Sequence, residues 1–116
     1  MRVPTVGWAI SHRTNLPIAA LLCHAYASSG DRRHAEQLLP ELTQHAMQGR
    51  LDPVWIGLIY AALGDKERSF IWLDKAYHAK SDTLLFLKVD PKYDSLRSDR
   101  RFSDLMRRLQ LLEPES

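Results

Sequence analysis

Apolar residues recur at helical spacing along most of this chain, and the clearest example lies between residues 54 and 63. Its apolar side chains fall three or four positions apart, at Ile56, Ile59, Tyr60 and Leu63. That spacing places them on one face of an α-helix. Asp52 suits the N-cap, Pro53 suits the first helical position, and Gly64 suits a left-handed helix end. The pattern therefore predicts a helix bounded by these residues.

A second helix is predicted to follow directly, with Asp65 as its N-cap. Its broad apolar face comprises Ser69, Phe70, Trp72, Leu73, Ala76 and Tyr77. The same arrangement occurs earlier in the chain, where Asn15 and Pro17 open a helix. Gly30 then closes that helix and Asp31 opens the next one. Two helical hairpins are expected.

The two predicted hairpins are copies of each other, related by a shift of 34 residues. Identical residues in register are Tyr26 and Tyr60, Ala27 and Ala61, Gly30 and Gly64, Asp31 and Asp65, and Leu39 and Leu73. Similar residues in register are Leu22 and Ile56, Arg32 and Lys66, and Ala35 and Ser69. A fixed period of this length is typical of a helical repeat protein. The small pair Ala35 and Ser69 suits the close approach of paired helices.

The period divides the chain into an N-terminal arm at 1–15, a repeat domain at 16–112 and a tail at 113–116. Within the domain we assign repeat one to 16–49, repeat two to 50–81 and a cap to 82–112. Asp82 is expected to begin a short helix with Leu84, Leu85, Phe86, Leu87 and Val89. Ser98 or Asp99 is expected to begin a last amphipathic helix with Phe102, Leu105, Met106 and Leu109. A terminal repeat that departs from the pattern is typical of a cap.

These residues resemble the tetratricopeptide repeat family over positions 16–81. The matching positions are Leu22, Tyr26, Gly30, Ala35 and Leu39, and then Ile56, Gly57, Tyr60, Gly64, Ser69, Leu73 and Ala76. Ala19 and Pro53 depart from the family's usual tryptophan, and Leu42 from its usual small alanine. The resemblance implies an all-α stack of antiparallel helix hairpins, an α–α superhelix, with a C-terminal capping helix.

A narrower resemblance covers residues 54–112. The segments that carry it are residues 58–64, 72–77, 86–91 and 96–99. They are similar to a tail that closes tetratricopeptide arrays in bacterial multidomain proteins, including winged-helix regulators and serine/threonine kinases. The resemblance implies the end of a regulatory array, or a free-standing relative of it. Neither a DNA-binding wing nor kinase motifs occur in this sequence.

Composition narrows the class of protein further. With 116 residues, 45% hydrophobic and 26% charged, the chain is predicted to form one globular domain. Its single cysteine, Cys23, excludes an internal disulfide framework, which favours a reducing compartment. No stretch approaches the roughly 20 apolar residues of a membrane span. Arg2, Pro4, Gly7 and Arg13 interrupt any signal-peptide core. We expect a cytoplasmic protein without a membrane partner.

The net charge of +2 is too small to indicate nucleic-acid binding by itself. The basic residues near the C-terminus are Arg97, Arg100, Arg101, Arg107 and Arg108. They are interpreted as a solvated edge, because aromatic residues that could stack on bases are missing among them. An acidic protein partner is the first alternative and nucleic acid the second.

Catalytic and metal-binding patterns are missing from the sequence. No two histidines lie four residues apart, and there is no phosphate-binding glycine loop. Cys23 and His24 are adjacent, so on a helix they point about 100° apart and cannot form a nucleophile–base pair. The carboxylates Asp90, Asp94 and Asp99 fit caps and turns better than a calcium loop. We expect no enzyme activity, no cofactor and no metal.

The resemblance implies that a partner lies in the concave groove lined by the first helix of each repeat. The candidate partner-binding residues are Ala20, His24, Ala27, Val54, Leu58 and Ala61. Relatives that grip the acidic tails of heat-shock chaperones have lysine and asparagine there, whereas these residues are mostly apolar. We therefore expect an interaction module for an apolar peptide, a partner helix or the chain's own arm.

The N-terminal edge of the first repeat suggests an alternative function, self-assembly into a homodimer. Two repeats and a cap are fewer than the three or more units that a stack normally needs. Trp8 and Ile10 on the arm and Leu21 on the first helix are the candidate dimer interface. Tryptophan is a frequent anchor of interfaces, and Trp55 is a second candidate for that role.

Overall fold

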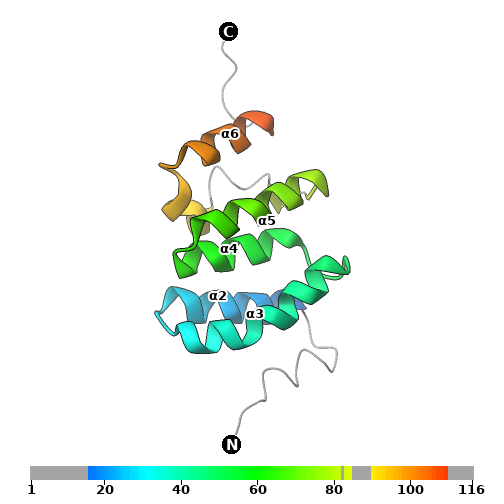
Figure 1. The fold of residues 1–116 in the computed structure, drawn as a ribbon, viewed down its shortest axis with the longest axis vertical. Helices are drawn as coiled ribbons and strands as arrows, with labels where there is room; N and C mark the ends of the chain where they lie inside the picture. The colour runs from blue at the N-terminus through cyan, green and yellow to red at the C-terminus, as the bar shows by residue number, and fades with distance from the viewer. Residues whose placement is uncertain (1–15, 82, 85–89, 110–116) are drawn as a thin grey trace, which may run out of the picture.

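The computed structural model describes residues 16–81, 83–84 and 90–109, and this part of the chain is all-helical. Its elements are α2 (Leu16–Ser28), α3 (Arg32–Met47), α4 (Pro53–Leu63), α5 (Lys66–His78), the 3-10 helix η2 (Pro91–Leu96) and α6 (Arg100–Arg108). Figure 1 shows the helices stacked along the long axis, with α2 and α3 at one end and α6 at the other. The all-α class is confirmed, and the tetratricopeptide-like stack stays a prediction.

The predicted turn between the two helices is confirmed in both hairpins, whereas Asn15, predicted to open the first helix, lies outside the described residues. Gly30 and Gly64 have φ angles of 91° and 86°, the left-handed region in which a glycine carries no steric penalty. The Asp31 carboxylate accepts a hydrogen bond from the backbone N–H of His34 at 3.2 Å. Asp65 accepts one from the N–H of Arg68 at 3.1 Å. Each turn thus stops one helix and starts the next within two residues.

Gly49, in the loop between the two hairpins, is more constrained than the sequence suggested. Its φ angle is 80°, close to that of Gly64 at 86°. The repeat pattern places Gly49 in a loop between repeats, which predicts a weaker constraint there than at Gly64. That prediction is wrong for the backbone conformation, since both glycines adopt the conformation that L-residues disfavour.

The helices of each hairpin approach closely at a pair of small residues. In the first hairpin the Cys23 thiol donates to the carbonyl oxygen of Ala35 at 3.3 Å. In the second hairpin the Ser69 hydroxyl donates to the carbonyl oxygen of Gly57 at 2.8 Å. Cys23 and Gly57 are 34 residues apart, as are Ala35 and Ser69. The predicted role of the small residues Ala35 and Ser69 is confirmed.

Helix α4 lies between two hydrophobic clusters. Ile56 and Ile59 belong to the first cluster, with residues of α2 and α3. Val54 and Leu58 belong to the second cluster, with α5, η2 and α6. Because α4 is apolar on both faces, it packs as a central element. Between the hairpins, the Arg32 guanidinium donates to the carbonyl oxygen of Leu63 at 2.8 Å and so satisfies the last turn of α4.

The C-terminal part of the described chain contains the last amphipathic helix expected from the sequence. Of the two N-cap candidates, Asp99 occupies the position and accepts a hydrogen bond from the N–H of Arg101 at 2.9 Å. Tyr93, Leu96 and Phe102 are buried in the second cluster. Asp82 and the segment 85–89, predicted as a short helix, lie outside the described residues, as do the arm with Trp8 and Ile10 and the tail.

Candidate functional site

The six residues predicted to line a binding groove occupy two different environments. Five of them are buried, with at most 5% of their surface exposed, namely Ala20, Ala27, Val54, Leu58 and Ala61. Only His24 is half-buried. The structure does not present the five buried side chains to a partner, which corrects the expectation of an open apolar groove at these positions.

The chain's own C-terminal segment explains why the α4 half of this groove is closed. Val54, Leu58 and Ala61 share a cluster with Leu84 and with Tyr93 of η2. The 3-10 helix therefore packs on the α4 face that the repeat pattern assigns to a ligand. The surface on which a free peptide was expected is part of the protein's core.

His24 is the one predicted groove residue that keeps a polar environment. Its Nδ1 lies 3.5 Å from the Ser28 hydroxyl one turn further along α2. Burial lowers the pKa of the imidazole, and the positive charge of Lys92 lowers it further, while Asp90 acts in the opposite direction. His24 is consequently a weakly basic group beside the start of η2 rather than a charged anchor.

An exposed apolar surface lies on α2, and we call it the α2 end face. It consists of Ile18, Leu21 and Leu22, which are 60%, 46% and 39% exposed, together with Ala25. Leu21 was predicted from the sequence as an interface residue, and Ile18 was not. The sequence signal for Leu22 was the 34-residue shift, because it pairs Leu22 with the core residue Ile56.

The composition of α2 is unusual for a helix at the end of a stack. It contains no Asp, Glu, Lys or Arg, and the same is true of the central helix α4. Helices that are apolar or uncharged all round are normally buried on several sides. In α4, the shifted equivalents of Leu22 and Ala25 are Ile56 and Ile59, and both are fully buried. α2 thus has the uncharged composition of the central helix α4, although it lies at the end of the stack.

A hollow of about 430 Å³ lies between α5 and α6. Two ion pairs cross it, Arg101 to Glu67 at 3.1 Å and Arg108 to Asp74 at 3.0 Å. The guanidinium of Arg101 also lies 4.7 Å from the centre of the Phe70 ring. Because these charges neutralise each other, the hollow offers no excess charge for a ligand.

Another hollow, of about 410 Å³, separates α3 from the second hairpin. Leu39, Tyr60 and Leu63 provide apolar lining, and Arg32 and Arg68 lie among the polar residues around them. Arg32 is bonded to the Leu63 carbonyl and Arg68 to Asp65, the latter at 2.7 Å. Arg32 therefore links the two hairpins, whereas Arg68 is paired within the second hairpin.

The described residues give little support for a reactive cysteine or a metal-binding site. Burial raises the pKa of the Cys23 thiol to about 12, so the thiol stays protonated and unreactive at neutral pH. No group of three or more His, Cys, Asp or Glu residues that could hold a metal ion occurs within the described ranges. The absence of enzyme activity stays a prediction.

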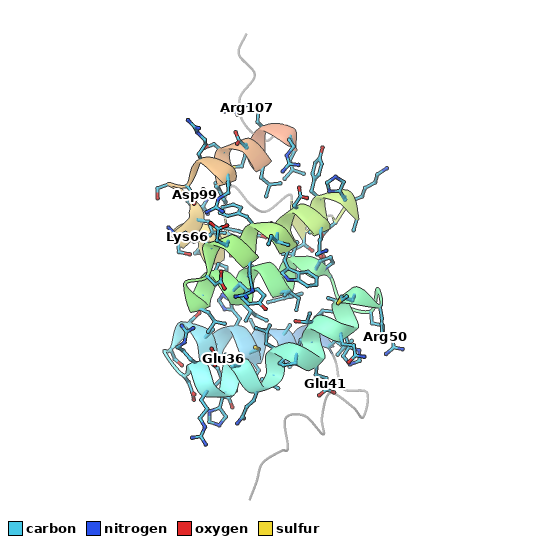
Figure 2. The ribbon with its side chains drawn as sticks, viewed as in Figure 1. Glu36, Glu41, Arg50, Lys66, Asp99 and Arg107 are labelled. Carbon is cyan, nitrogen blue, oxygen red and sulfur yellow. The ribbon has the colours of Figure 1, made fainter. Side chains whose placement is uncertain are left out.

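The described arginines of the C-terminal region are mostly paired with carboxylates. Arg101 contacts Asp99 at 2.9 Å, and Arg107 contacts Asp104 at 2.9 Å. Figure 2 shows Lys66 and Asp99 together at one edge of the stack and Arg107 on α6 at its end. This agrees with a solvated edge of balanced charge, and a nucleic-acid or acidic partner gains no support from it.

Trp55, the second candidate anchor, is half-buried and packs against both hydrophobic clusters. Because it packs against both clusters, the Trp55 side chain contributes to the protein's internal packing. Of the large hydrophobic residues that are exposed in the described chain, Ile18, Leu21 and Leu22 all lie on α2, whereas Met47 and Ile71 lie singly on α3 and α5.

Comparisons with protein-family models, with curated proteins and with solved structures return no match for this chain. Among the described helices, none has both the length and the apolar character needed to cross a membrane.

Proposed function

We propose that this chain is a protein-interaction module without enzyme activity, a helical scaffold that holds its partner on the α2 end face. The observation that carries the proposal is the exposure of Leu21 and Leu22 on a helix without a formal charge. Exposed apolar patches of this kind mark interaction sites on soluble proteins.

The packing of α4 within this chain indicates which kind of partner would fit the α2 end face. The equivalent side chains of α4 pack against the helical hairpin formed by α2 and α3. A partner that presents a helix or a helical hairpin with small apolar side chains would cover Leu21 and Leu22 in the same manner. The resemblance to tetratricopeptide repeats is consistent with this, since such units stack face to face.

A second candidate function uses the same surface for self-assembly. Because α2 carries no formal charge, two copies of it meet without electrostatic repulsion. The scaffold would then be a homodimer, and binding of another protein would need a different surface.

The proposal is tested by placing a photo-crosslinking amino acid at Leu21 in one variant and at Ile71 in another. Ile71 is the matched control, because it is an apolar residue of α5 with 54% exposure. We expect an adduct of discrete mass at position 21 and none at position 71, and Leu22→Glu should abolish it. Equal adducts from both positions, or none from either, would contradict an interaction site on α2.

A further inference from the structure

We draw no further inference here: the strongest candidate, the apolar α2 end face of Ile18, Leu21 and Leu22, is the surface already described, and nothing in the described part of the chain shows what covers it.

Discussion

The Ser69 hydroxyl donates a 2.8 Å hydrogen bond to the carbonyl oxygen of Gly57, and this contact sets how closely α5 approaches α4. Ser69 is fully buried, so the hydrogen bond satisfies a hydroxyl that would otherwise be costly in the core. A Cβ atom at Gly57 would lie 3.0 Å from Leu73 Cδ2 and 3.1 Å from the Ser69 carbonyl oxygen. The hairpin therefore needs glycine on one helix opposite serine on the other.

Gly57→Ala should destabilise the protein, although alanine is the better helix former. The helical preference for alanine is worth roughly 1 kcal/mol, whereas overpacking a core typically costs about 1–3 kcal/mol. The Ser69 carbonyl belongs to the backbone of α5 and cannot rotate away as a side chain could. We expect a lower midpoint in urea unfolding. A higher midpoint would show that the two helices separate easily.

Gly64→Val and Gly49→Val should lose similar amounts of stability. Both glycines have positive φ, and neither has a heavy atom within 4 Å of the place where a Cβ would lie. The cost then comes from the backbone conformation alone, roughly 1–2 kcal/mol for each substitution. Asparagine, which tolerates this conformation, should cost less at both sites. A thermal melt in which only the Gly64 variant is destabilised would restore the view that the inter-repeat loop is loosely constrained.

Tyr93→Phe should leave the stability unchanged or raise it by up to about 1 kcal/mol. The ring is fully buried, and its hydroxyl has no hydrogen-bond partner in the part of the chain that the structure describes. Removing an unsatisfied hydroxyl while keeping the ring removes a desolvation cost. Tyr93→Ala serves as the control, since loss of the ring should cost about 3–5 kcal/mol. A marked loss of stability in the phenylalanine variant would reveal a hydrogen bond for this hydroxyl.

The free energy of unfolding should fall at acid pH because Asp99 becomes protonated. Hydrogen bonds from the Arg101 side chain and backbone N–H lower the pKa of this carboxyl to about 2, below its ordinary value of 3.8. The folded state therefore favours the ionised form. The contribution of the Asp99 carboxylate to the free energy of unfolding is complete above about pH 4 and is lost as the pH falls through about 2.

Asp99→Asn keeps an N-cap side chain but removes the charge. We expect the variant to show a flatter dependence of unfolding free energy on pH between about 4 and 2. High salt should flatten the wild-type curve in the same window, since it screens an ion pair at the surface. An unchanged slope in the variant would mean that other carboxylates account for the acid sensitivity.

The helix ends could be predicted from the sequence because their causes are local. An Asp side chain reaches a backbone N–H two or three residues further on, and a glycine adopts positive φ wherever a turn needs it. Asp31, Asp65 and Gly64 thus show their roles in the sequence itself. The close approach at Ala35 and Ser69 was also foreseeable, because the 34-residue shift places these two small residues at equivalent positions of the two hairpins.

The tertiary structure alone decided which neighbour each apolar face meets. Helical spacing indicates that Val54 and Leu58 share a face, but it does not say whether a ligand or the chain covers that face. The cover includes Tyr93 and Leu96, more than thirty residues further along, and no periodicity links them to α4. Likewise, Leu22 corresponds to the buried Ile56 in the repeat, and only the order of helices in space places Leu22 at the end of the stack. Burial depends on long-range packing, whereas a cap depends on residues within one turn.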